Sequence, residues 1–253
     1  MKQKEYRILI TDEQKQKNYP NGYFDSIVRK NNSLGNRIAN WFVFIFLGVI
    51  LNIGFLIGIP VALTNGFTLS FFICVAVGIA QFLLCTLILR SGKKARSKTR
   101  ETWIAETVTN SHCQESEVRE FDQQFMNSDS YFLTLNGKID NTLPYFLTED
   151  FILIGAKIAP VVLPIQSLLG VCFAYKLEFY SDFKGRLKTR DSLAVGLCTK
   201  DLDYAIFADQ NLGKEFIAML KEKNPNMAVR EGEILKEEDF NAWVKELQAA
   251  NRV

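Results

Sequence analysis

Residues 38–89 have the sequence IANWFVFIFLGVILNIGFLIGIPVALTNGFTLSFFICVAVGIAQFLLCTLIL, which contains no Asp, Glu, Lys or Arg. A hydrocarbon core of about 30 Å is crossed by about 20 apolar helical residues, and Ile38–Pro60 and Thr68–Leu89 are each long enough. Pro60 and Thr64-Asn65-Gly66 interrupt the stretch, and Pro, Asn and Gly end one helix and begin another. The stretch therefore predicts a transmembrane α-helical hairpin.

Positive charge flanks this stretch on both sides. Arg29, Lys30 and Arg37 precede it and six Lys or Arg residues lie within 90–100, whereas the loop between the spans is uncharged. Short cytoplasmic flanks of membrane proteins retain Lys and Arg, so we expect a two-span protein of the cell membrane with both termini cytoplasmic. The alternative, two buried helices of a soluble protein, would require a helix pair with no charged face.

The hairpin and the patterns around it divide the chain into five segments. They are a cytoplasmic N-terminal segment (1–37), the hairpin (38–90), a basic juxtamembrane segment with an amphipathic stalk helix (91–128), a cytoplasmic domain (129–229) and a C-terminal amphipathic helix (230–253). In the first segment Phe24, Ile27 and Val28 recur at helical spacing. This spacing fits either a short helix at the membrane interface or a tail that packs on the C-terminal domain.

Apolar residues recur at three- and four-residue steps beyond the hairpin. Trp103, Ile104 and Phe121 follow this spacing among charged residues. We therefore expect one amphipathic stalk helix over residues 97–125, or two helices divided near Asn110-Ser111-His112.

Small residues in the two spans predict how the hairpin packs. Gly54 and Gly58 form a GxxxG motif, and Ala76 and Ala80 give the second span a small-residue face at matching depth. Because small residues permit close approach of helix backbones, we expect these positions to pack within the hairpin. Dimerisation through the same face is the alternative.

Short β-branched or aromatic runs follow residue 131. The predicted strands are 145–147, 151–154, 161–163, 170–180, 192–199 and 204–207. Turn residues separate them. A helix over 211–223 carries the apolar stripe Leu212, Phe216, Met219 and Leu220, and Asn224-Pro225-Asn226 ends it. This order predicts a cytoplasmic α+β domain, a small antiparallel β-sheet or barrel closed by a C-terminal helix.

Two motifs of this domain resemble a known family. The runs YFLTEDFIL (145–153) and VLPIQSL (162–168), with a helix ending in KNPN (223–226), resemble the bacterial pleckstrin-homology-like (PH-like) domains of small membrane proteins. The resemblance covers about residues 131–229, with Gln166 at a position usually occupied by an acidic residue. It implies a PH-like fold with a binding or scaffolding role, and it brings no catalytic residue.

Four alternating cations form the clearest candidate contact site. Lys184, Arg186, Lys188 and Arg190 alternate with uncharged residues, and alternate residues of a strand share one face. Like charges on one face favour an anionic partner, so this ladder is a candidate contact for anionic lipid headgroups. The alternative is a charged strand edge that prevents pairing with other chains.

No motif of an established catalytic or cofactor site is present. The sequence lacks a P-loop, GxGxxG, GxSxG and HExxH, and the sole histidine, His112, has only Cys113 beside it, without a CxxC. The acidic pairs Glu149-Asp150 and Asp201-Leu202-Asp203 occur where turns are expected. We expect no enzyme activity, no cofactor and no metal. Because the basic run at 90–100 is explained by the membrane flank, we also expect no nucleic-acid binding.

These patterns together predict a non-enzymatic, membrane-anchored interaction module, in which two transmembrane helices tether a PH-like domain. The expected partners are the lipid bilayer and either anionic lipid headgroups or an unidentified membrane protein. The alternative is a structural or accessory subunit whose hairpin pairs with a transporter or another membrane complex.

Overall fold

The computed structural model describes residues 5–33, 97–137, 144–155, 160–181 and 187–251, with scattered residues between 38 and 93. The chain forms two compact units. The first comprises Met1–Tyr23 and Trp103–Val253, and the second comprises Phe24–Thr102. The second unit is therefore an insertion in the chain of the first.

The prediction of two membrane spans is corrected by the structure. Most of Ile38–Pro60 and Thr68–Leu89 lies outside the described residues, and no helix among the residues described is long and apolar enough to cross a membrane. The helices that flank the stretch, α2 (Tyr23–Asn31) and α6 (Arg100–Ser111), have 9 and 12 residues. At 1.5 Å per residue they reach about 14 and 18 Å, short of the roughly 30 Å of a hydrocarbon core.

This finding, made on the described residues, contradicts every prediction that was built on the hairpin. It contradicts the membrane-hairpin fold class, the membrane-anchored module, the accessory subunit that pairs through its hairpin, and the location in the cell membrane. The described residues form an α+β structure with two sheets. Gly54 and Gly58 lie outside the described residues, whereas Ala76 and Ala80 are described and exposed.

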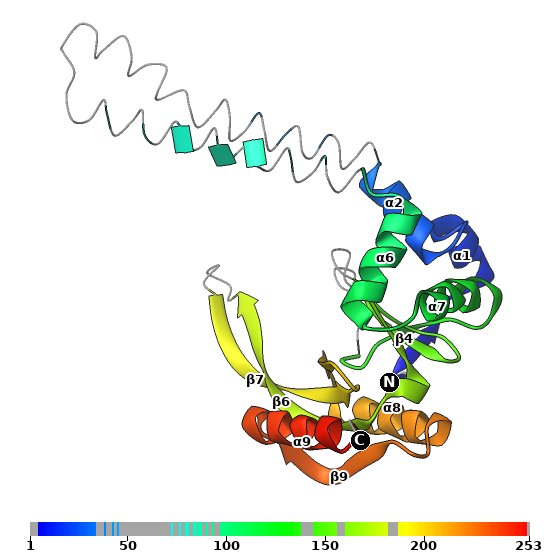
Figure 1. Cartoon of the computed structure of the whole chain (residues 1–253), viewed down its shortest axis with the longest axis vertical. Helices are drawn as coiled ribbons and strands as arrows, with labels where there is room; N and C mark the ends of the chain where they lie inside the picture. Colours follow the sequence, from blue (N-terminus) through cyan, green and yellow to red (C-terminus); the bar gives the residue numbers. More distant parts are fainter. Residues whose placement is uncertain are drawn as a thin grey trace, which may run out of the picture. The chain divides into compact units, whose positions relative to one another are not determined.

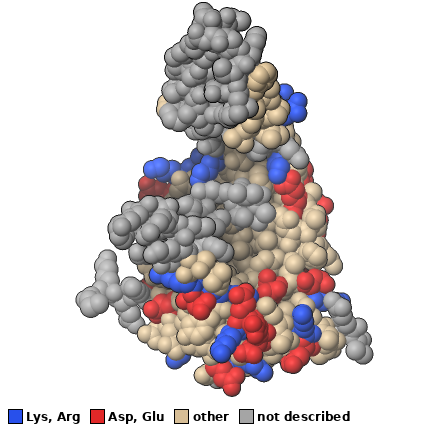
Figure 2. Space-filling view, turned by 90° about the vertical axis from the view of Figure 1, so that its left-hand side faces the viewer, with Lys and Arg blue, Asp and Glu red and all other residues tan. Residues whose placement is uncertain are grey.

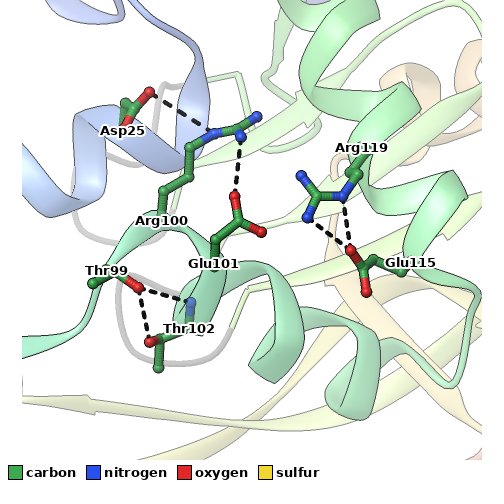
Figure 3. Close-up of polar contacts among 7 residues, drawn as sticks. All are labelled: Asp25, Thr99, Arg100, Glu101, Thr102, Glu115 and Arg119. Atoms are coloured by element: carbon green, nitrogen blue, oxygen red, sulfur yellow. Dashed lines mark hydrogen bonds and ion pairs between the residues drawn. The ribbon is translucent and has the colours of Figure 1, made fainter.

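Within the second unit, polar contacts connect α2, near its start, to the first residues of α6, near its end. Arg100, the first residue of α6, forms ion pairs through Nε with Asp25 of α2 (3.8 Å) and through Nη1 with Glu101 (3.4 Å), as Figure 3 shows. The Thr99 hydroxyl accepts a hydrogen bond from the Thr102 backbone N–H at 3.3 Å and so caps the helix. Phe24 of α2 is fully buried, which opposes a helix lying at a membrane interface.

The first sheet contains five short antiparallel strands in the order β1-β2-β3-β4-β5. They are β1 (Arg7–Leu9), β2 (Tyr131–Leu133), β3 (Tyr145–Leu147), β4 (Phe151–Ile154) and β5 (Val161–Pro164). β1 comes from the N-terminal segment and pairs Arg7 with Leu133. The sequence did not predict this strand, because three residues are too few to show a period.

The second sheet has the order β8-β7-β6-β9. It contains β6 (Gly170–Ser181), β7 (Leu187–Cys198) and β8 (Asp203–Phe207), which are antiparallel, and β9 (Ala228–Leu235), which is parallel to β6. β9 was not predicted, because charged residues and Gly232 obscure the strand pattern in a region expected to lead into a helix. The expected single sheet or barrel is thus two sheets.

The main hydrophobic core lies between the two sheets and helix α8 (Gln210–Lys223). The first sheet contributes residues such as Leu147 and Ile152, and the second contributes residues such as Val171 and Leu197. Leu212, Phe216 and Leu220 of α8 are buried, which confirms the predicted helix and most of its apolar stripe.

Helix α9 (Glu237–Ala250) covers the outer face of the second sheet (Figure 1). Phe240 and Trp243 of α9 pack there against Cys172 and Cys198. The helix comes very close to β7 at Gly196, where a Cβ atom added to the glycine would lie 2.4 Å from the Phe240 ring. A side chain at this position would prevent the observed packing.

The outer face of the first sheet is covered by α7 (Glu115–Asn127), with the N-terminal α1 (Asp12–Asn18) and the residues after it. Phe125 of α7 meets Phe146 of β3 edge-on at 5.3 Å between ring centroids, and Tyr19 meets Phe125 at 5.0 Å. The predicted division into two helices near residue 111 is confirmed. The predicted stalk is wrong, because Val118, Phe121 and Phe125 of α7 are buried.

Candidate ligand-binding pocket

A pocket of about 570 Å³ lies between α8, β9 and Phe173 of β6. On the helix side its lining residues are Gln210, Lys214, Ile217, Ala218 and Lys221. Their spacing places them on one face of an α-helix. The Asp209 side chain fixes the start of this helix by accepting a hydrogen bond from the Asn211 N–H at 3.0 Å.

A bulge in β9 forms the opposite side of the pocket. On β9 the lining residues are Val229, Arg230, Gly232, Glu233 and Ile234. Arg230 pairs with Cys172 of β6, but the next β6 residue, Phe173, pairs with Ile234. Three β9 residues therefore loop out of the parallel pairing, which bends the strand away from β6 at this point.

Glycine is required at the centre of this bulge. Gly232 has φ +82°, a left-handed conformation that other residues adopt only with strain. A Cβ at Gly232 would meet no atom within 4 Å, so the position faces open space. The bulge thus gives the pocket an open side.

The apolar walls of the pocket belong to the protein core. Phe173 is 7% exposed, and it packs in the main core together with Ile217 and Ile234. A Cβ at Gly213 of α8 would lie 2.6 Å from the Phe173 ring, so the absence of a side chain there lets the helix approach β6. Helix α8 therefore packs directly against the Phe173 ring.

The charged side chains that line the pocket differ in the hydrogen bonds and ion pairs that they make within the protein. Lys221 Nζ donates hydrogen bonds to the carbonyls of Pro225 (2.8 Å) and Met227 (2.9 Å), so it closes the end of α8. Arg230 Nη1 lies 3.8 Å from Glu233 Oε2, and both side chains are largely exposed, so water screens this pair strongly. Among the described residues no hydrogen bond or ion pair occupies the ammonium of exposed Lys214. Lys214 and Arg230 are therefore available to a ligand.

A second, more polar pocket of about 380 Å³ lies at the corner between α6 and α7. Its lining includes His112, Cys113 and Asp201. His112 has φ 53° and ends α6 in the left-handed conformation common after a helix C-terminus. Burial raises the pKa of the Cys113 thiol, and a weaker contribution from the Ser111 hydrogen bond opposes the shift. The thiol is therefore protonated at neutral pH and is a poor nucleophile.

The acidic pairs identified in the sequence make local contacts or line a pocket. Asp150 accepts a hydrogen bond from Gln124 Nε2 of α7 at 2.7 Å, which docks the β3–β4 turn on that helix. Asp201 lines the second pocket. Within the described part of the chain, no group of three or more His, Cys, Asp or Glu residues is placed to hold a metal ion.

The predicted cation ladder is only partly described. Lys184 and Arg186 lie outside the described residues, and β7 begins at Leu187. Lys188 pairs with Tyr180 and Arg190 pairs with Glu178 in the register of β6 and β7. A contact of this ladder with anionic lipid headgroups or with a membrane protein stays a prediction.

Acidic and basic side chains are mixed over the lower part of the face drawn in Figure 2. A duplex-binding surface would instead gather Lys and Arg along one stripe. The absence of nucleic-acid binding stays a prediction.

Lys214 and Arg230 were missed in the sequence for a physical reason. Lys214 looks like any solvated position of an amphipathic helix, and Arg230 lies in a strand that the pattern did not show. No family model, curated protein or solved structure matches the chain. The geometry of the pocket therefore carries the functional argument.

Proposed function

We propose that the first unit is a non-enzymatic binding module that holds a small ligand in the pocket between α8 and β9. The composition of this pocket carries the proposal, because both residues of the main core and two cations without firm partners line it. Pockets of about 300–1,000 Å³ with apolar walls and a few polar groups commonly hold small molecules. The volume of about 570 Å³ lies within that range.

The arrangement of the elements supports a binding role over catalysis. Strands are followed by α8, whose apolar stripe packs in the main core with residues of both sheets, and a closing helix is what the resemblance to PH-like domains implies. That resemblance implies binding or scaffolding. Among the described residues that line the pocket there is no Ser, Cys or His that could act as nucleophile or base.

A neutral fluorescent probe tests the pocket without involving its charges. We expect N-phenyl-1-naphthylamine to bind the full chain saturably, with one site per chain and enhanced fluorescence. Ala218→Trp should weaken binding at least tenfold, because the indole would fill space beside Ile217 and Phe173. Ala242→Trp on the exposed side of α9 is the matched control and should bind like the wild type.

Two results would refute this proposal. One is probe fluorescence that rises without saturation. The other is an Ala218→Trp protein that is folded, as judged by circular dichroism, yet binds the probe as tightly as the control.

A further inference from the structure

We infer that the pocket between α8 and β9 takes an amphipathic anion, an alkyl or acyl chain with one carboxylate or phosphate head. This inference rests on the proposed function and specifies its ligand class. The described charged side chains of the lining are three cations and one carboxylate, Lys214, Lys221, Arg230 and Glu233.

The apolar lining of the pocket indicates that the ligand has an apolar chain. Phe173, Ile217 and Ile234 present side chains of the main core toward the pocket. Burying one methylene group contributes about 0.8 kcal/mol, which is about fourfold in Kd. We therefore expect affinity to rise about fourfold with each added methylene until the chain fills the pocket.

The anionic head follows from the two available cations. Lys214 comes from α8 and Arg230 comes from β9, so a head between the helix and the strand could contact both. The guanidinium of Arg230 offers a planar pair of donors that fits a carboxylate or a phosphate. A cationic head would instead meet repulsion from these side chains.

Glu233 competes with the ligand for Arg230. Its Oε2 lies 3.8 Å from Arg230 Nη1 and it belongs to the bulge of β9. An anionic head would replace this carboxylate beside the guanidinium. Glu233→Gln should therefore tighten binding of an anionic ligand and leave binding of a neutral one unchanged.

Displacement of N-phenyl-1-naphthylamine from the full chain tests the inference with four ligands of one chain length. Decanoate and decyl phosphate should displace the probe at concentrations about tenfold lower than 1-decanol, and decylammonium should be the weakest. The tighter of the two anions identifies the head. Inorganic phosphate alone should not displace the probe.

Variants assign the effect to the two cations. Lys214→Gln and Arg230→Gln should each weaken decanoate or decyl phosphate about tenfold without affecting 1-decanol. Lys245→Gln, an exposed change on α9, is the matched control. Added salt should weaken the anions alone, because the cations are exposed and screened.

The outcomes separate this inference from the proposed function. If 1-decanol displaces the probe as well as decanoate does, the pocket binds ligands but the inferred anion is wrong. If inorganic phosphate displaces the probe as effectively as decyl phosphate does, the inference that the ligand has an apolar tail is wrong. Failure of the neutral probe to bind at all would overturn the proposed function itself.

Discussion

Replacing Asn224 by alanine should destabilise the first unit by about 2–3 kcal/mol. Asn224 follows α8 and is 4% exposed. Its Nδ2 donates to the carbonyl oxygens of Ile165 and Leu168, both at 3.0 Å. Each lost hydrogen bond costs about 0.5–1.5 kcal/mol, and carbonyls left buried without a donor add to the loss. The turn between β5 and β6 would keep the hydrogen bond from Gln166 Nε2 to the Lys223 carbonyl (2.8 Å) but lose those from Asn224.

Urea-induced unfolding of the full chain measures this loss, with the fluorescence of buried Trp103 and Trp243 as the signal. Asn226→Ala is the matched control, because Asn226 is exposed and belongs to the same Asn-Pro-Asn sequence. We expect the control to stay within about 0.5 kcal/mol of the wild type.

A second substitution separates the hydrogen bonds from packing. Asn224→Asp keeps the side-chain size but removes the amide donor and turns an oxygen toward two carbonyls, so it should be at least as destabilising as Asn224→Ala. If Asn224→Asp is milder than Asn224→Ala, or if Asn224→Ala behaves like the control, the hydrogen-bond argument is refuted.

Three further predictions concern other positions. Gly196→Ala should lower the free energy of unfolding in urea by about 1–3 kcal/mol, since its Cβ would lie 2.4 Å from the Phe240 ring. Adding Phe240→Leu should recover part of this loss. If the effects of the two substitutions are simply additive, the clash is refuted. His112→Gly should stabilise by about 1 kcal/mol in the same assay, because glycine adopts φ 53° without strain, and a loss would contradict this. Burial raises the pKa of Cys172 to about 12 and of Cys198 to about 11, above the value of about 8.5 in an unfolded chain. The folded state then keeps protons that the unfolded state releases, so urea midpoints should fall as pH rises above about 8.5, and less steeply in Cys198→Ala; an unchanged slope would exclude this thiol.

The sequence predicted elements better than their assembly. Helix 211–223 was predictable because its apolar residues repeat at the helical period, and the runs at 145–147 and 151–154 because β-branched and aromatic residues concentrate in strands. The division into two sheets depends on pairing between distant residues, which no local pattern specifies. β9 was hidden for a further reason, since its bulge breaks the alternation.

The candidate pocket was not predictable, and the membrane hairpin is a prediction that the described helices contradict. The pocket depends on a three-residue bulge and on the close approach of α8 at Gly213, which are properties of the folded chain alone. The hairpin was inferred from composition over residues 38–89. Composition reports how apolar a segment is, and it does not report the length of the helices that the chain forms.

The pairing of β1 with β2 sets an order in time for the newly made chain. Arg7 pairs with Leu133, so β1 leaves the ribosome long before its partner strand exists. At about 5–20 residues per second, the N-terminal segment waits on the order of 6 to 25 seconds for β2. In a chain that lacks β1, β2 is the edge of the first sheet, and an open edge can pair with another chain. Truncation before Ile10 should therefore appear first as aggregation during expression.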